Sequence, residues 1–359
     1  MALWQKTLAR VLEGGRLSDE GALEILQHAD LTVLGQAADE IRRRKHPRSL
    51  VTFIIDRNIN YTNICVSKCR FCAFYREASA PDAYLLCSDV LQHKVTETIA
   101  AGGTQIMLQG GLHPNLGLPY FEKLLRAVKS RHDITLHCFS PAEVAHMAAQ
   151  EGISVRDTLL RLQAAGLDSL PGGGAEILHE TVRARVSPQK ISAARWLQVM
   201  ETAHHIGLGT TATMVIGLGE TLPQRIGHWR VLRDLQARTG GFRAFIMWSF
   251  QPGNTALGGG KISAWDYLRT LAAARLYLDN IPHLQGSWVT QGEAVGQLTL
   301  AFGADDLGSI MLEENVVRAA GTAFSMSVEK MLDLIRAAGK IPAQRDTRYE
   351  IIKIFGKGE

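Results

Sequence analysis

The chain has 359 residues, 46% hydrophobic and 21% charged, and a net charge of +4 from 39 basic and 35 acidic side chains. These values are typical of a globular protein that buries a core without disulfides. The charge balance argues against nucleic-acid binding, and no apolar run reaches the about 18 residues of a membrane span. The odd number of five cysteines favours a reducing compartment, so we expect a cytoplasmic protein without nucleic-acid or membrane partners.

The first 48 residues predict three helices in front of the main domain. They extend over residues 3–12, from Ser18 onwards, and from Leu31 to just before Pro47. We expect residues 1–48 to form a helical cap.

Strand and helix patterns alternate from residue 49 onwards. Buried strand patterns are expected at 51–65, 104–111, 134–140, 168–178, 210–220, 243–254, 285–292 and 300–309. Repeated βα units produce a parallel sheet, and about eight units favour an α/β fold of the TIM-type (β/α)8 barrel class, complete or partial. A six-unit barrel with a C-terminal subdomain is the alternative. We assign residues 49–325 to the barrel, and residues 326–359 to a helix and tail packed on it.

The most specific motif is the segment Cys65-Val-Ser-Lys-Cys69-Arg-Phe-Cys72. Three cysteines on one tight loop can face a single inorganic centre as thiolates, and the nearby cations Lys68, Arg70 and Arg76 favour that form. Four cysteines are the rule for iron–sulfur clusters, so a trio predicts a cluster with one iron left open. A non-catalytic zinc site completed by Cys87, Cys138 or a histidine is the alternative.

This spacing, with Phe71 before the third cysteine, resembles the radical S-adenosylmethionine (SAM) superfamily. The resemblance implies that Cys65, Cys69 and Cys72 hold a 4Fe-4S cluster whose fourth iron is chelated by SAM. We therefore expect the 4Fe-4S cluster and SAM as cofactors, with Phe71 beside them.

Further residues at the predicted strand ends match other parts of the superfamily pattern. The resemblance implies that the backbone of Gln109, Gly110 and Gly111 takes the SAM amino group, although the acid usual at the third position is absent. It implies that Glu176 binds the ribose hydroxyls. By the residues alone, a tight turn explains the glycines and a helix dipole explains Glu176 equally well.

Three more positions complete the predicted SAM site. The turn at Ile216 and Gly217 resembles the segment that brackets adenine, and Ser140 opens a helix after the third strand. One basic residue of the group Arg183, Arg185 and Lys190 is expected to meet the SAM carboxylate, and Arg185 is included in the predicted site.

Aromatic and amide side chains on the later strands suit a substrate with one flat ring and one polyhydroxyl part. The predicted substrate-binding residues are Trp248, Gln251, Asn254, Trp288, Gln291 and Asp306. By the residues alone, a place in the barrel core is favoured over a ligand role for the two tryptophans. His113 is the predicted proton-transfer residue, by its type alone.

Longer stretches resemble one family of this superfamily, the dehypoxanthine futalosine cyclases of the futalosine route to menaquinone. They include RNINYTNIC, CRFCAFYR, LQGGLHP, SPAE, GGGAEIL, FQPGNT and SWVTQG, between about residue 50 and the C-terminus. Aminofutalosine synthase shares the cysteine loop and GGGAE, whereas FQPGNT and SWVTQG favour the cyclase.

The resemblance implies a radical cyclisation. A 5′-deoxyadenosyl radical abstracts the ribose C4′ hydrogen of dehypoxanthine futalosine, and the sugar radical adds to the benzoate ring. It also implies a small nucleoside-derived substrate, an external electron donor such as flavodoxin or ferredoxin, and a base near the ring, for which His113 or a late acid is the candidate.

Overall fold

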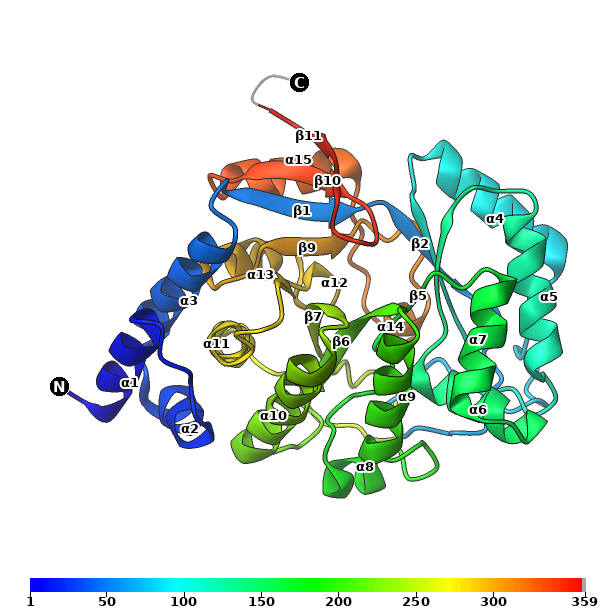
Figure 1. The fold of residues 1–359 in the computed structure, drawn as a ribbon, viewed down its shortest axis with the longest axis horizontal. Coiled ribbons are helices and arrows are strands. Elements are labelled where there is room, and N and C mark those ends of the chain that lie inside the picture. The colour runs from blue at the N-terminus through cyan, green and yellow to red at the C-terminus, as the bar shows by residue number, and fades with distance from the viewer. Residues whose placement is uncertain (357–359) are drawn as a thin grey trace.

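The computed structural model describes residues 1–356, and a parallel β-barrel occupies its centre (Figure 1). The strands pair in the order β2 to β9, each with the next along the chain. Their bounds are β2 (Asp56–Asn60), β3 (Gln105–Gln109), β4 (Thr135–Cys138), β5 (Ser169–Leu170), β6 (Gly209–Ile216), β7 (Phe242–Ser249), β8 (His283–Gln285) and β9 (Asp306–Ser309).

The barrel is closed by one nearly continuous segment, made of β1 (Leu50–Ile54) and β2. The β1 half pairs with β9, with Thr52 opposite Asp306, and the β2 half pairs with β3. Beyond β9, the backbone of residue 310 donates to the carbonyl of Ile54 at 3.1 Å. The β1–β2 segment and strands β3 to β9 thus fill eight barrel positions among the described residues, which confirms the predicted TIM-type barrel.

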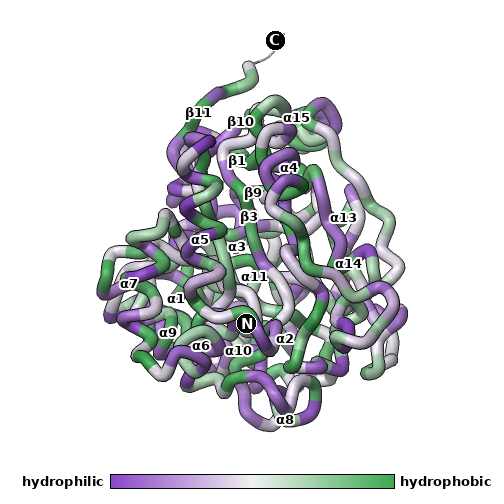
Figure 2. The backbone as a smooth tube through the Cα atoms, turned by 90° about the vertical axis from the view of Figure 1, so that its right-hand side faces the viewer, coloured by the Kyte–Doolittle hydropathy of each residue, from purple (hydrophilic) through white to green (hydrophobic). Residues whose placement is uncertain are grey.

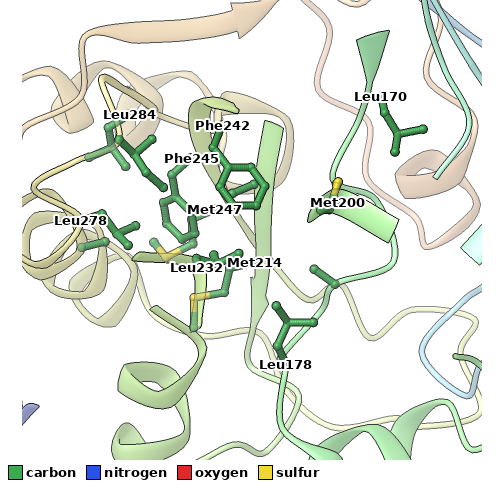
Figure 3. Packing of buried hydrophobic residues seen from close by; sticks show 14 of the residues in the cluster. Leu170, Leu178, Met200, Met214, Leu232, Phe242, Phe245, Met247, Leu278 and Leu284 are labelled. Carbon is green, nitrogen blue, oxygen red and sulfur yellow. The ribbon is translucent and has the colours of Figure 1, made fainter. Parts of the chain in front are cut away.

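The core lies between the barrel strands and the surrounding helices. Strands β6 and β7 are rich in buried apolar residues, as expected where both faces of a parallel sheet are covered. Figure 3 shows Phe245 and Met247 of β7 close to Leu232 and Leu278, which belong to the surrounding helical layer. This packing fixes the positions of the strand ends, where the site is built.

Helices connect successive strands and form the outer layer. They are α4 (Ser88–Ala100), α5 (Leu118–Lys129), α6 (Pro141–Glu151), α7 (Val155–Ala165), α8 (Glu180–Val186), α9 (Ala193–His205), α10 (Leu222–Thr239) and α11 (Ala264–Tyr277). In Figure 2, α5 and α7 carry both hydrophilic and hydrophobic residues along their length. This is the pattern of a helix with one face on a core and one in water. No helix within residues 1–356 is long and apolar enough to cross a membrane.

The three predicted N-terminal helices are present as α1 (Leu3–Leu12), α2 (Asp19–His28) and α3 (Leu31–Lys45). Helix α3 packs on α11, and α2 packs on both α10 and α11. Figure 1 shows them in blue beside the outer layer of helices. They therefore cover one flank of the barrel.

The segment after residue 325 is more than a helix and a tail. Helix α15 (Val328–Ala337) is followed by β10 (Ile341–Arg345), which pairs in parallel with β1, and by β11 (Ile351–Ile354), antiparallel to β10. The turn between them reaches the barrel, where Arg345 pairs with Asp306 at 2.6 Å. The prediction missed both strands, and the last three residues of the predicted 326–359 unit lie outside the described residues.

The strand predicted at 285–292 is also wrong. Strand β8 ends at Gln285, and the chain then forms short helices: α12 (Trp288–Gln291), α13 (Glu293–Leu298), the 3-10 helix η1 (Thr299–Ala301) and, after β9, α14 (Val316–Ala319). Gly292 has φ +81 and separates α12 from α13. Trp288, Val289 and Thr290 favour a strand by propensity, but a segment this short fits a short buried helix as well, so the pattern could not decide.

Candidate active site

The cysteine loop starts at the carboxyl end of β2, the end of a barrel at which active sites lie. Its backbone is tied to itself: Cys65 donates to the carbonyl of Arg76 at 3.1 Å, and Cys72 donates to that of Cys69 at 3.1 Å. Lys68 between them has φ +43. All three cysteines line one pocket of about 220 Å³. We call it the cluster pocket.

The lining of the cluster pocket contains most of the predicted cofactor residues. They come from the ends of β2, β3, β4 and β5, and are Cys65, Cys69, Phe71, Cys72, Gln109, Gly110, Gly111, Ser140 and Glu176. Residues separated by more than 100 positions in the chain thus meet at one barrel end. Their roles in binding remain predictions, but their convergence is the geometry that those roles require.

The donor set fits an iron–sulfur cluster better than a single zinc ion. Three thiols line the cluster pocket and, among residues 1–356, no fourth cysteine does, which leaves one iron of a four-iron cluster without a protein ligand. The other zinc candidates are absent from the pocket lining, because Cys138 is fully buried in β4 and Cys87 is exposed.

The electrostatic surroundings of the cysteines differ from the expectation. Lys68 pairs with Glu77 and Arg76 pairs with Asp82, each at 2.6 Å, so these charges are already neutralised. Burial raises the pKa of Cys69 to about 12, and the opposing influence is the charge of Lys190. Burial also raises the pKa of Cys72, so metal binding at Cys69 and Cys72 must displace their protons.

The glycine pair after β3 forms one wall of the pocket, where the chain passes very close to other groups. A Cβ at Gly110 would lie 2.6 Å from Cζ of Tyr61, and a Cβ at Gly111 would lie 2.1 Å from the carbonyl oxygen of Ile64. No side chain fits at either place. The glycines therefore allow the loop after β3 to lie directly against the cysteine loop, and this wall of the pocket is formed by backbone.

Glu143 is a functional candidate that the sequence interpretation missed. It lies on α6, lines the cluster pocket and is 3% exposed. Its Oε1 accepts hydrogen bonds from Tyr61 Oη at 2.7 Å and from the backbone of Gly110 at 3.1 Å. Burial raises its pKa to about 7. It has no cationic partner among the described residues, so this wall of the pocket can receive a cation.

The segment SPAE contained the signal for Glu143. Ser140 caps α6 by accepting from the backbone of Glu143 at 3.3 Å, which fixes the first turn of the helix at the end of β4. An acid three residues after such a cap is also common in helices without a site. The sequence alone could not show that the carboxylate of Glu143 reaches the loop after β3, in which the usual acid is absent.

Glu176 also lines the cluster pocket, with 5% exposure and φ +43. Its carboxylate pairs with Lys190 at 2.9 Å and with Arg183 at 3.4 Å. Arg183 is buried and also donates to the carbonyls of Gly174 and Ala175, which fits a structural role. Lys190 is the one of the three predicted basic residues that lines the pocket, and it lies 5.6 Å from the Phe71 ring centre.

Three predicted cofactor residues lie away from the cluster pocket lining. Arg185 donates to the carbonyl of Leu218 at 2.7 Å. Ile216 is fully buried at the end of β6, and Gly217, with φ +91, donates to Glu220 at 3.0 Å. These contacts form the turn after β6, and the predicted contacts with adenine and the SAM carboxylate stay predictions.

A second, apolar pocket of about 130 Å³ adjoins the first. The two share Phe71, Cys72 and Val316. Trp248 and Gln251, both predicted to bind substrate, line this apolar pocket at the end of β7. A ligand in it would therefore lie next to one in the cluster pocket.

The other predicted substrate residues lie elsewhere. Trp288 is 3% exposed and donates to the carbonyl of Ser309 at 3.0 Å, and Gln291 donates to Ser249 Oγ at 2.5 Å. Asn254 is exposed and donates to the carbonyl of Ala319 at 2.9 Å.

The expected position of Asp306 at the carboxyl end of a strand is wrong. Asp306 is the first residue of β9, is fully buried, and pairs with Arg345. An ion pair at the amino end of the barrel favours a structural role.

His113 follows the glycine pair but is not part of the cluster pocket lining. Its Nδ1 accepts from the backbone of Asn115 at 3.1 Å. Partial burial lowers its pKa, and His146 adds to this effect. Its predicted role in proton transfer stays a prediction.

Comparison with known proteins agrees with this geometry. Residues 59–228 match the family model of the Radical SAM superfamily, and residues 239–357 match that of the CofH/MqnC C-terminal region. Among solved structures, methylornithine synthase (PylB) has a TM-score of 0.76 with 18% identity, covering 94% of this chain and 97% of that one. At this identity the likeness shows the fold alone.

Relatives of nearly full length narrow the family. A cyclic dehypoxanthine futalosine synthase of Halalkalibacterium halodurans is 49% identical over 97% of this chain and 95% of its own. A 5-amino-6-(D-ribitylamino)uracil–L-tyrosine 4-hydroxyphenyl transferase of Methanopyrus kandleri is 39% identical, covering 97% of each chain. An aminodeoxyfutalosine synthase of Thermus thermophilus is 38% identical, covering 98% of this chain and 96% of its own. The chain therefore belongs to the radical SAM superfamily and, within it, to the family of the cyclic dehypoxanthine futalosine synthases.

Proposed function

We propose that this protein converts dehypoxanthine futalosine into cyclic dehypoxanthine futalosine in menaquinone biosynthesis. The observation that carries the proposal is the open three-cysteine pocket in a chain 49% identical to a synthase of that name. Identity to the 4-hydroxyphenyl transferase and to aminodeoxyfutalosine synthase is about ten percentage points lower, which supports the cyclase over these relatives.

The residues present fit a 4Fe-4S cluster and SAM. Cys65, Cys69 and Cys72 would hold three irons. The backbone at Gly110 and Gly111, which lies directly against Tyr61 and the cysteine loop because neither residue has a Cβ, would contact SAM. When bound, the cluster and SAM supply a 5′-deoxyadenosyl radical, given one electron from an external donor such as flavodoxin or ferredoxin.

Charged groups that line the cluster pocket would orient SAM. Glu143 has no cation of its own and would receive the ammonium group, while Lys190 would receive the carboxylate. Glu176 would accept from the ribose hydroxyls, since a carboxylate has acceptor capacity beyond its bond with Lys190. With both charged ends fixed, the ligand has one orientation in the pocket.

The apolar pocket would hold the flat ring of the substrate beside the cluster pocket. Trp248 and Phe250 supply apolar contact area, and the shared residue Val316 marks where ribose and ring meet. Holding ring and ribose carbon close together favours ring closure over escape of the sugar radical.

The test is a comparison of substrates under anaerobic conditions with SAM and a strong reductant. The proposal predicts a cyclic product from dehypoxanthine futalosine, and no product from the substrates of aminodeoxyfutalosine synthase or of the 4-hydroxyphenyl transferase. Turnover of either alternative in place of dehypoxanthine futalosine would overturn it. The reducing compartment expected from five free cysteines supports the cytoplasm as the place of the reaction.

A further inference from the structure

Three pockets meet around the short helix α14. Val316 lines both the cluster pocket and the apolar pocket. Arg318 and Ala319, on the same helix, line a third pocket of about 540 Å³. We call this third cavity the polar pocket; it is lined by Asn60, Asn63, Phe74, Arg76, Asp82, Tyr84, Leu86, Lys94, Glu313, Asn315, Arg318 and Ala319. Through Asn60, Asn63 and Phe74 it adjoins the cluster pocket.

The apolar pocket can take a ring but offers nothing to a carboxylate. No lysine or arginine lines it. The amide nitrogen of Gln251 already donates to the carbonyls of Ser249 and Thr290 at 3.3 and 3.2 Å. Burying an ionised carboxylate without a partner is strongly unfavourable. The acidic end of a benzoate must therefore point out of this pocket.

The polar pocket has one cation in surplus. Arg76, Lys94 and Arg318 face two carboxylates, Asp82 and Glu313. Arg76 pairs with Asp82 at 2.6 Å and Lys94 pairs with Glu313 at 2.5 Å.

The surplus cation is Arg318. No carboxylate lies within ion-pair distance of its guanidinium among residues 1–356. Its backbone is fixed, because Glu314 accepts from the backbone groups of residues 316, 317 and 318 and so caps α14. A planar guanidinium suits bidentate binding of a carboxylate.

We infer that Arg318 in the polar pocket binds the carboxylate of the substrate's benzoate group. The inference rests on the proposed function and adds the orientation of the substrate: ring in the apolar pocket, ribose at Val316, carboxylate towards Arg318. The carboxylate keeps its charge throughout the reaction, so Arg318 stabilises the bound substrate and the transition state equally. Its loss should raise KM and leave kcat nearly unchanged.

The experiment combines two proteins with two substrates. Wild type and Arg318→Ala are assayed with dehypoxanthine futalosine and with its neutral benzamide analogue. Because Arg318 is exposed, we expect KM for the acid to rise by up to about fivefold in Arg318→Ala. The benzamide should show no such rise, and Arg318→Lys should recover part of the loss. Added salt should raise KM of wild type more than that of Arg318→Ala.

Arg156→Ala is the matched control, since Arg156 is an exposed arginine on α7 that lines none of the three pockets. SAM also carries a carboxylate, so SAM affinity is measured in each variant. An unchanged KM in Arg318→Ala, equal losses for acid and benzamide, or a fall in SAM affinity instead would each overturn the inference while wild-type turnover upholds the proposed function. A wild type that neither binds nor cyclises dehypoxanthine futalosine refutes the proposed function, and this inference with it.

Discussion

Glu143 is the residue whose position says most about the ligand. A buried carboxylate is costly unless a cation or several donors stabilise it. Glu176 has the cations Lys190 and Arg183. Among the described residues, Glu143 has only uncharged partners: Tyr61, Ser140 and the backbone of Gly110. A pocket with one unmatched buried carboxylate is poised for a cationic ligand.

Glu143→Gln should weaken SAM binding. A glutamine can still accept from Tyr61 and Gly110, so the wall keeps its shape and loses only the charge. Loss of a charge-assisted hydrogen bond costs about 1.5–3 kcal/mol, roughly tenfold or more in affinity. The measurement is the dissociation constant of SAM for cluster-loaded protein, with Tyr61→Phe as a variant that retains the carboxylate. Equal affinities of wild type and Glu143→Gln would remove Glu143 from the SAM site.

The same pair of proteins tests the protonation of Glu143. Its pKa of about 7, raised from 4.5 by burial, leaves it largely neutral below pH 7 and ionised above. The ionised form attracts an ammonium group, so SAM affinity of wild type should increase as pH rises from 6 to 7.5. Glu143→Gln should lack this increase, and a pH profile identical in both proteins would contradict the assignment.

The cysteine trio can be tested against the zinc alternative at the same scale. Cys65→Ala, Cys69→Ala or Cys72→Ala should each abolish cluster absorbance and SAM cleavage, because each removes one of three ligands. Cys87→Ala and Cys138→Ala are the controls, since neither thiol lines the pocket. Iron and sulfide are quantified after anaerobic reconstitution. Loss of the cluster in Cys87→Ala would instead indicate a four-cysteine site.

Among the structural elements, the turns after β2 and β3 depend on each other. The loop at Gly110 and Gly111 lies so close to Tyr61 and Ile64 that neither turn can move alone. Gly111 donates to the carbonyl of Thr62 at 3.0 Å, and Leu112 donates to Cys65 Sγ at 3.3 Å. The loop after β3 therefore also positions Cys65, a predicted cluster ligand.

Gly111→Ala should disturb this coupling. The added Cβ would lie 2.1 Å from a carbonyl oxygen of the cysteine loop, and overpacking of this kind costs about 1–3 kcal/mol. We expect reduced cluster content after reconstitution and a lower unfolding temperature. Gly227→Ala on α10, where nothing lies within 4 Å of the added Cβ, should be neutral or slightly stabilising. Full cluster content in Gly111→Ala would refute the coupling.

The elements also show how far sequence reasoning reaches. The alternation of strand and helix segments along the sequence located the strands β2 to β7. The N-terminal helices were located by their own helix signals. The strand predicted at 285–292 is wrong, because a short buried helix and a strand can have the same composition. Strand β10 was missed because Pro342 and polar residues interrupt an apolar pattern, and only its pairing with β1 shows it to be a strand. Strand β11 is shown by its pairing with β10. Glu143 was missed because its partner loop is more than thirty residues away in the chain.

At the scale of the whole molecule, the barrel separates a functional end from a structural end. The carboxyl ends of the strands hold the three pockets. The amino end is filled by the turn between β10 and β11, where the Tyr349 ring stacks on His283 at 3.9 Å. Buried ion pairs such as Arg345–Asp306 hold this turn in place. Substitutions at the amino end should therefore affect stability more than substrate choice.

Buried neutral histidines predict how stability depends on pH. Burial lowers the pKa of both His137 and His228 from 6.5 to about 3. Below pH 6.5 the unfolded chain takes up protons that the folded protein cannot. The free energy of unfolding therefore decreases as the pH is lowered. Each histidine contributes up to about 1.4 kcal/mol per pH unit between pH 6.5 and 3.

Denaturant unfolding at pH 7.5, 6.5 and 5.5 measures this dependence. The loss between pH 6.5 and 5.5 should exceed that between pH 7.5 and 6.5. His137→Gln should show a smaller acid-induced loss than wild type, even if its stability is lower throughout. A loss of equal size in both proteins would show that His137 is not the titrating group.

The central claim is that this barrel directs a radical to the ribose C4′ of dehypoxanthine futalosine. Its most direct test is an anaerobic incubation of the reconstituted wild-type protein with SAM, reductant and substrate deuterated at C4′, followed by mass spectrometry of 5′-deoxyadenosine and of the nucleoside product. We expect one deuterium in 5′-deoxyadenosine and a cyclic product that has lost it. Cyclic product with unlabelled 5′-deoxyadenosine, or labelled 5′-deoxyadenosine without any cyclic product, would contradict it.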